Sequence, residues 1–305
     1  MDNRLRSDRP ARKQSMVDDP INRKPLPVVL TVAGSDSGGG AGIQADLKTF
    51  AAMGCFGTSA VTCLTAQNPD RIEGIEPVPP AFVALQMRMV FEGFDVAAVK
   101  TGMLYSESIV GAVSAALDER PTLPLVVDPV MVATSGKRLL REKAVERMVK
   151  DLLPRATVVT PNTPEAERLT GRTIRTEKEM EQAAREIAER YGCACVIKGG
   201  HLAGETITDV LYAKGVCLVE RSSRVGGTDS HGTGCTFAAA LAAALAHGAD
   251  LADAFRSARE FVANAIRHAR PAGGRHPLNP LFRLSPIPPR NKPETESETT
   301  GSTTG

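Results

Sequence analysis

A cysteine stands at the start of a strongly helical segment, residues 230–248, which reads SHGTGCTFAAALAAALAHG. The run of alanine and leucine is typical of a helix, and its glycines predict that it begins near Gly234 or Cys235. The first backbone N–H groups of a helix lack a partner within it and carry partial positive charge. Because glycines let a bulky anion approach these groups, Gly232, Thr233 and Gly234 are candidates for holding a phosphate. The same position would lower the pKa of the Cys235 thiol; a glycine turn followed by a small buried cysteine is the structural alternative.

A second group of candidate ligands lies in TPNTPEA, residues 160–166. Asn162 and Glu165 stand three residues apart where a strand enters a helix, and their oxygens could hold Mg²⁺ through water, as this ion usually binds. The same spacing is also a helix-capping signature, so both interpretations stay open. Asp128 ends an apolar strand in VVDPV that should be central. Since aspartate is disfavoured in strands, we interpret it as a metal- or phosphate-related residue in preference to an Asp–Pro turn.

An amide and a carboxylate are candidates for recognising an organic substrate. Gln67 ends a strand beside Asn68, and its amide offers both a donor and an acceptor to the edge of a heterocycle. Asp46 could face the same site from the first turn of a helix, although favourable pairing with the helix dipole explains it nearly as well. His201 and His231 are lone histidines near these segments, and neither is assigned a catalytic task.

The glycine-rich segment GSDSGGGAGIQAD, residues 34–46, looks like a dinucleotide-binding turn because residues 40–45 fit G-x-G-x-x-A. Such a site also needs an acidic residue at the end of the second strand, about twenty positions on. Here that strand ends in the uncharged residues 65–67, so a loop over a small substrate fits better than NAD binding. A Walker A sequence is also absent, since ATSGKRLL at 133–140 lacks the upstream glycine and the following Ser or Thr.

Composition excludes several classes of function. Charged residues make up 24% of the 305 residues, and the formal net charge is only +2. The protein as a whole therefore has no strong electrostatic attraction for nucleic acid or a membrane surface. No apolar run is long enough to span a bilayer, and residues 1–19 lack the apolar segment of a secretory signal. The six cysteines are scattered, without a CxxC spacing. We therefore expect a cytoplasmic protein with free thiols.

Strand-like and helix-like segments alternate over residues 27–283, which we expect to form one domain between two disordered polar tails, 1–26 and 284–305. Continuous apolar strands between helices are typical of an α/β fold with a mostly parallel sheet covered on both faces. The expected strands are 27–34, 58–67, 95–102, 123–130, 156–162 and 193–200, with a hairpin at 208–220, and the expected helices are 41–54, 79–94, 106–118, 142–153, 164–170, 176–191, 234–247 and 250–269. The glycine-bearing and polar segments follow the carboxyl ends of these strands, which meet along one edge of such a sheet. We therefore expect these segments to converge on one enzyme site.

The chain closely resembles the hydroxymethylpyrimidine/phosphomethylpyrimidine kinases of thiamine biosynthesis in seven motifs that occur in order: AGSDSGGGAGIQADLKTF, TAQN, KTGML, DPVMVATSG, TPNTPEA, KGGH and HGTGCT. The likeness covers residues 27–283. It implies the ribokinase-like fold, a three-layer α/β/α sandwich with a mostly parallel central sheet. Ser37 and Gly38 stand where some members have Pro-Ser, a departure that changes loop flexibility and leaves the catalytic positions intact.

The resemblance also assigns roles to residues. Cys235 would occupy the place of the catalytic base, where many ribokinase-like relatives carry Asp, beside an anion hole formed by residues 232–234. Gln67 would recognise the aminopyrimidine ring in a pocket lined by Ala41, Met103 and Val130. Asn162 and Glu165 match the N-x-x-E element near Mg²⁺ and the phosphates. The predicted site thus comprises substrate contacts at Gln67, Ala41, Met103, Val130 and Asp46, cofactor contacts at Asn162, Lys198 and Asp128, a metal contact at Glu165, and catalytic groups at Gly232, Thr233, Gly234 and Cys235.

An ATP- and Mg²⁺-dependent kinase is the function that the resemblance implies. It would phosphorylate the hydroxymethyl group of 4-amino-5-hydroxymethyl-2-methylpyrimidine and then phosphorylate that monophosphate to the diphosphate. Phosphoryl transfer needs positioning and charge stabilisation more than covalent chemistry. A pyridoxal or pyridoxine kinase on the same scaffold and a non-catalytic pyrimidine-binding sensor are the alternatives. The partners would be the pyrimidine and ATP, without nucleic acid or membrane, and a homodimer is expected because relatives of this kind often form one.

Overall fold

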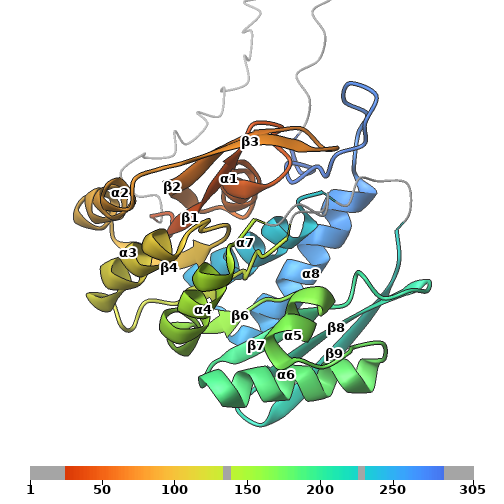
Figure 1. Ribbon diagram of the computed structural model, residues 1–305. Coiled ribbons are helices and arrows are strands. Elements are labelled where there is room, and N and C mark those ends of the chain that lie inside the picture. Colours follow the sequence, from red (N-terminus) through yellow and green to blue (C-terminus); the bar gives the residue numbers. More distant parts are fainter. Residues whose placement is uncertain (1–24, 133–138, 226–230, 285–305) are drawn as a thin grey trace, which may run out of the picture.

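The computed structural model describes residues 25–132, 139–225 and 231–284 (Figure 1). The tails predicted from the sequence, 1–26 and 284–305, lie outside these ranges, apart from residues 25, 26 and 284. Within the described ranges, nine strands form one sheet in the order β3-β2-β1-β4-β5-β6-β7-β8-β9. The strands are β1 (Val28–Asp36), β2 (Phe56–Gln67), β3 (Ile72–Pro77), β4 (Val96–Thr101), β5 (Leu125–Val127), β6 (Val158–Val159), β7 (Ala194–Lys198), β8 (Thr206–Ala213) and β9 (Val216–Ser223).

The mostly parallel sheet predicted from the sequence is confirmed. β2, β1, β4, β5, β6 and β7 run parallel to one another, whereas β3 at one edge and β8 and β9 at the other pair antiparallel. The predicted hairpin is confirmed as β8–β9, and it turns at Lys214 and Gly215, both with positive φ. β3 was not predicted, because a short segment such as IEGIEP becomes a strand only through its pairing with β2.

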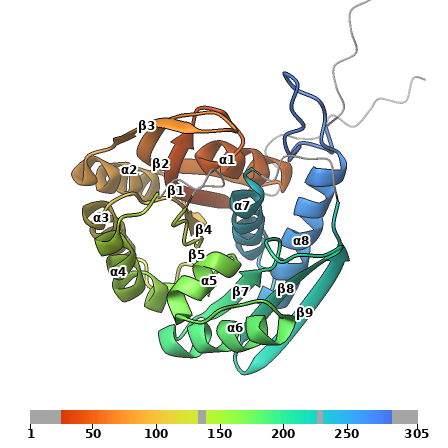
Figure 2. The same ribbon diagram turned by 45° about the vertical axis from the view of Figure 1, so that its right-hand side comes forward.

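Helices cover both faces of the sheet, as Figure 2 shows. They are α1 (Gly42–Ala52), α2 (Pro80–Gly93), α3 (Glu107–Asp118), α4 (Glu142–Asp151), α5 (Thr163–Thr170), α6 (Glu177–Tyr191), α7 (Thr233–Ala246) and α8 (Leu251–Arg267), with a 3₁₀ turn at Leu153–Arg155. Successive residues of one central strand face opposite layers: Val126 packs with α7 and α8, and Val127 packs with the layer of α2 to α6. Burial on both faces explains why the parallel strands are continuous apolar runs.

Hydrogen bonds that continue past the strands align the motifs along one edge of the sheet. The Asp128 N–H donates to the Thr101 carbonyl (3.0 Å), and the Lys198 N–H donates to the Pro161 carbonyl (2.9 Å). Asn162 and Lys198 form a further parallel bridge beyond β6 and β7. The polar residues that follow different strands therefore lie side by side, as the sequence predicted. Among the helices that the structure describes, none is long and apolar enough to cross a membrane.

Candidate active site

α7 begins at Thr233, one residue before the predicted start, with Gly232 as its N-cap. Gly232 has a φ of 85°, and a β-carbon there would lie 1.8 Å from the carbonyl oxygen of Gly40. Only glycine satisfies both constraints, because other residues rarely adopt this φ and any side chain would collide with the backbone. The Gly40 loop therefore lies directly against the start of α7. Residues 238–243 are fully buried, so α7 is a rigid support for whatever its first turn binds.

The Cys235 thiol is half-buried in the first turn of α7, and the Gly42 backbone N–H is close enough to act to lower its pKa. Burial raises the pKa of this thiol to about 11; Lys100 opposes the rise, and Asp46 and Asp128 reinforce it. The sequence predicted a lowered pKa, and that prediction is wrong for this structure. The reason is that loss of water and proximity to two carboxylates outweigh the N–H groups and one ammonium.

Lys100 lies on β4, fully buried, and forms an ion pair with Asp46 of α1. Its Nζ lies 2.8 and 3.0 Å from the two Asp46 oxygens, and the Thr31 hydroxyl donates to one of them at 2.6 Å. Asp46 stands at the fifth residue of α1, beyond the first turn. Because its carboxylate is enclosed and bonded to protein groups, we assign it the role of holding Lys100, in place of the predicted contact with substrate. The sequence analysis missed Lys100, although a lysine inside the apolar run VAAVKT is a usable signal.

The Lys198 ammonium lies between Asp128 and the start of α7. Its Nζ is 2.8 Å from Asp128 Oδ1, and a β-carbon on Gly234 would lie 3.3 Å from the same Nζ. The Thr160 hydroxyl also donates to Asp128 Oδ1 at 3.2 Å. Burial acts to lower the pKa of Lys198, but Asp128 and Glu165 raise it overall, so the side chain remains a cation. A cation beside the first N–H groups of a helix suits a phosphate.

Asn162 and Glu165 form both halves of a capping box at the start of α5. The Glu165 N–H donates to the Asn162 side chain and the Asn162 N–H donates to the Glu165 carboxylate, each at 2.9 Å. The other Glu165 oxygen accepts from the Met131 N–H at 3.4 Å. Burial raises the pKa of Glu165 to about 7, opposed by Lys198 and reinforced by Asp128. The capping interpretation is therefore confirmed. Among the residues described, no three or more His, Cys, Asp or Glu are grouped so as to hold a metal ion.

The predicted pocket residues meet near the ends of β2 and β4. Met103 and Val130 belong to one small apolar cluster with Ile72 and Leu139. Gln67 pairs with Ile72 across the β2–β3 ladder and is half-buried. The unpredicted strand β3 therefore contributes an apolar wall beside the amide, which suits one edge and one face of a flat ring.

Asp36, at the end of β1, organises the glycine-rich loop. Its carboxylate accepts three backbone N–H bonds, from Gly38 (2.8 Å), Gly40 (3.1 Å) and Ala41 (2.8 Å). His231 Nε2 lies 3.0 Å from Asp36 Oδ2. Burial alone would raise the pKa of Asp36, but the hydrogen bonds of His231 and the backbone lower it overall. A β-carbon on Gly232 would lie 3.5 Å from Ala41 Cα, so this loop joins the pocket to α7. The sequence analysis missed Asp36, although Asp before glycines is a turn signal.

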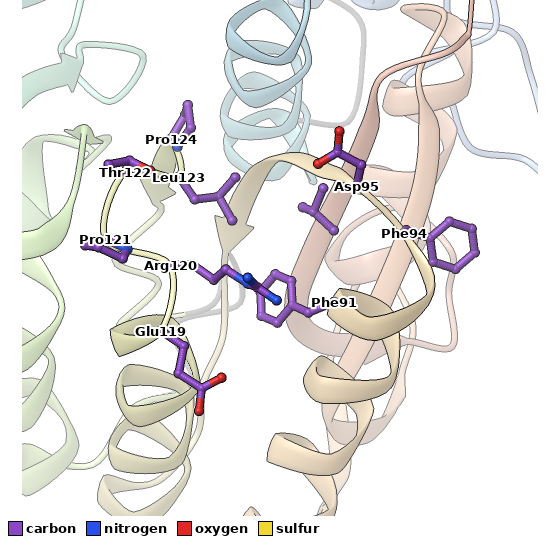
Figure 3. A pocket seen from close by; sticks show the side chains of 10 residues that line it. Phe91, Phe94, Asp95, Glu119, Arg120, Pro121, Thr122, Leu123 and Pro124 are labelled. Atoms are coloured by element: carbon purple, nitrogen blue, oxygen red, sulfur yellow. The ribbon is translucent and has the colours of Figure 1, made fainter.

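A hollow of about 380 Å³ lies elsewhere, at the amino ends of β4 and β5 (Figure 3). Phe91, Arg120 and Pro124 are among its lining residues, and the Arg120 guanidinium stands over the Phe91 ring at 5.4 Å. Because the strands are parallel, this hollow is at the opposite edge of the sheet from Cys235. It contains none of the residues that the sequence analysis selected, so we do not include it in the candidate site.

A sequence profile described as phosphomethylpyrimidine kinase matches residues 36–279. The chain belongs to this family. It is 46% identical over 268 residues to the thiamine biosynthesis bifunctional protein ThiED of Geobacter sulfurreducens, which covers 87% of this chain and 55% of that protein. It is 45% identical over 252 residues to the hydroxymethylpyrimidine/phosphomethylpyrimidine kinase of Haemophilus influenzae, covering 81% of this chain and 94% of that protein. The chain thus spans about half of the longer relative and nearly all of the shorter.

Solved structures confirm the predicted ribokinase-like α/β fold of this phosphomethylpyrimidine kinase family member. A pyridoxal kinase from Bacillus subtilis in complex with ADP superposes with a TM-score of 0.78 at 36% identity, over 86% of this chain and 100% of that one. A phosphomethylpyrimidine kinase from Clostridium difficile superposes with a TM-score of 0.70 at 39% identity, over 79% of this chain and 99% of that one.

Proposed function

We propose that this chain is an ATP-dependent kinase of 4-amino-5-hydroxymethyl-2-methylpyrimidine and of its monophosphate. One observation carries the proposal: the Lys198 ammonium lies beside Gly234, at the helix start that also bears the Cys235 thiol. A phosphate-binding helix terminus, a cation and a proton acceptor are the groups that phosphoryl transfer to an alcohol requires. The curated relatives with most of their length matched carry this kinase name, and solved pyridoxal kinases with ADP or AMP-PCP support ATP as donor.

The first turn of α7 would act on the migrating phosphoryl group. Its N–H groups and Lys198 would stabilise the charge on the phosphoryl oxygens as the bond from the γ-phosphorus to ADP breaks. In the first phosphorylation the hydroxymethyl oxygen would form the new bond to phosphorus, and its proton would pass to the Cys235 sulfur. In the second, an ionised oxygen of the monophosphate would form that bond, and no alcohol proton is transferred. The sulfur can accept the alcohol proton only as a thiolate. Lys100 favours the thiolate, while burial disfavours it, so the base form is scarce at neutral pH.

Magnesium belongs to the same proposal. Mg²⁺ binds proteins through one or two carboxylates and keeps several waters, and Asp128 and Glu165 are both close enough to Lys198 to raise its pKa. These two carboxylates and the Asn162 carbonyl are the residues that would hold the ion through water. When bound, the ion would neutralise charge on the nucleotide phosphates. The capping bonds of Glu165 restrict it to a contact through water or through a remaining lone pair.

The test is ADP release with three purified acceptors: the pyrimidine alcohol, its monophosphate and pyridoxal. We expect kcat/KM to be higher for the pyrimidine alcohol and its monophosphate than for pyridoxal, and Cys235→Ala to abolish turnover of the pyrimidine alcohol. Gln67→Leu should raise KM for the pyrimidine well before it affects KM for ATP, because of the two substrates the amide would contact only the pyrimidine ring. Unchanged turnover in Cys235→Ala would contradict the assignment of the base.

Pyridoxal kinase is the second candidate, because pyridoxal kinases superpose on this chain with TM-scores up to 0.78. Both substrates are hydroxymethylated six-membered heterocycles, and a thiol at Cys235 could add reversibly to an aldehyde. A higher kcat/KM for pyridoxal would establish this candidate. Tight pyrimidine binding without ADP release would instead support a non-catalytic sensor. The homodimer and the cytoplasmic location belong to the main proposal, and sedimentation velocity tests the first.

A further inference from the structure

The Gln67 amide lies between two polar groups that limit how it can be oriented. On one side the structure places its Nε2 3.3 Å from His231 Nε2. On the other side it places its Oε1 3.2 Å from the Thr65 hydroxyl oxygen. Each neighbour has one further partner: His231 Nε2 is 3.0 Å from Asp36 Oδ2, and the Thr65 hydroxyl is 2.9 Å from the Ser35 carbonyl oxygen. Because the oxygen and nitrogen of an amide are nearly indistinguishable by shape, these partners decide its orientation.

The Asp36 carboxylate determines where the His231 ring carries a proton. This carboxylate accepts three backbone N–H bonds, which with His231 hold its pKa below the usual value. An ionised carboxylate can only accept, so His231 Nε2 must carry a hydrogen to bond it at 3.0 Å. A protonated Nε2 cannot also accept from an amide N–H. The Gln67 group that faces His231 must therefore be the oxygen.

The contacts of Thr65 indicate the same orientation of the Gln67 amide. Its hydroxyl has one hydrogen, and the Ser35 carbonyl at 2.9 Å can only accept it. The Thr65 oxygen is then left as an acceptor, so the Gln67 group at 3.2 Å must be the amide nitrogen. In this orientation the Gln67 nitrogen donates to Thr65, and the Gln67 oxygen shares the Nε2 hydrogen of His231 with Asp36. In the reverse orientation His231 and Gln67 would face each other as two donors, and Thr65 would have one hydrogen for two acceptors.

We propose that His231 is a positioning residue that, through its Nε2–H, holds the Gln67 amide with its oxygen toward His231 and its nitrogen toward Thr65. The inference rests on the proposed function. One amide N–H and one oxygen lone pair remain for the half-buried site. Their fixed order suits a ring edge on which a nitrogen acceptor lies next to an amino donor, and it disfavours an edge with a carbonyl oxygen, which can only accept, in the amino position. His231 is therefore specificity-determining, and it does not contact the migrating phosphoryl group.

The place of His231 in the chain supports this role. It immediately precedes Gly232, the N-cap of α7, and a β-carbon on Gly40 would lie 2.7 Å from its ring carbon Cδ2. Its side chain is 15% exposed, so the ring is clamped between the glycine-rich loop and Gln67. A shift of the loop or of α7 would thereby be transmitted to the ring-recognising amide.

The first test measures the ring tautomer of the wild-type chain by long-range ¹H–¹⁵N NMR of the histidine side chains. Loss of one signal set in His231→Gln assigns the ring. We expect Nε2 to carry the proton at neutral pH. A neutral ring protonated on Nδ1 instead would overturn the inference, whatever the enzyme's activity.

The second test is a double-substitution cycle on KM for the pyrimidine alcohol. His231→Leu removes the donor and should raise this KM about tenfold, the usual effect of losing one partly buried hydrogen bond, with KM for ATP unchanged. His231→Gln places an N–H near the Nε2 position and should restore KM to within about threefold. In a Gln67→Leu background, His231→Leu should add nothing further.

Multiplying effects in the double variant would overturn the inference, because His231 would then act independently of Gln67. His247→Leu is the matched control, since His247 caps the far end of α7 and should leave both KM values unchanged. If the wild type does not phosphorylate the pyrimidine at all, the proposed function fails and the specificity role falls with it. The tautomer still decides the amide orientation in that case.

Discussion

The ionisation of Cys235 gives the sharpest test of the proposed mechanism. With the thiol pKa raised to about 11, about one thiol in ten thousand is ionised at pH 7, which corresponds to about 5 kcal/mol. The thiolate fraction should rise tenfold with each pH unit until the pH approaches the pKa. Only the thiolate can accept the proton, so kcat/KM for the pyrimidine alcohol should also rise tenfold per pH unit. The measurement is made with ATP below its KM, because kcat/KM then reports the ionisation of the free protein.

Two assays measure this slope. In the first, iodoacetamide labels the protein between pH 6.5 and 10, and mass spectrometry follows the peptide that contains Cys235. We expect its labelling rate to rise tenfold per pH unit without a plateau. In the second, kcat/KM of the wild type is compared with that of Cys235→Asp. Aspartate starts from a reference pKa near 4, so a similar upward displacement leaves it ionised by pH 7, and its profile should be flat above that pH.

A labelling plateau near pH 7 would refute the reasoning. It would mean that the start of α7 and Lys100 outweigh burial and the two carboxylates around the sulfur. Cys217, half-buried on β9 with a pKa that burial also raises, is an internal control for the general effect of pH on labelling.

Three further predictions concern stability. Gly232→Ala should abolish turnover and destabilise the fold by at least about 2 kcal/mol. Gly248 also has a positive φ, but a β-carbon there would have no atom within 4 Å, so Gly248→Ala should cost only about 1 kcal/mol. Urea unfolding measures both losses. Lys100→Met should cost about 3–5 kcal/mol, because it leaves Asp46 as an uncompensated buried charge, and adding Asp46→Leu should recover most of that loss in the same assay. The folded pKa of Glu165 is raised from 4.5 to about 7, so the folded state binds this proton more tightly than the unfolded state. The free energy of unfolding should therefore fall by roughly 3 kcal/mol between pH 4.5 and 7. Glu165→Gln should remove this fall, and an unchanged pH dependence in the variant would contradict the assignment.

Local patterns predicted much of the fold. Apolar runs such as residues 95–102 and 193–200, separated by helical periodicity, are signals that lie within about ten residues of the chain. They correctly indicated parallel strands with polar residues at their carboxyl ends. Asn162 and Glu165 also carried a local signal, and the capping box that it predicts is present.

Only the tertiary structure decided which of these polar groups act on one another. Lys100 bonds Asp46 across 54 residues, and His231 bonds Asp36 across 195, separations over which no sequence period holds. The sign of the pKa shift at Cys235 was decided in the same way. The helix start is visible in the sequence and favours a thiolate, but burial and the neighbouring carboxylates are sums over groups from several strands and helices. The sequence by itself therefore determined the elements and the edge where the chemistry gathers, and packing determined the charges at that edge, because desolvation depends on everything that surrounds a group.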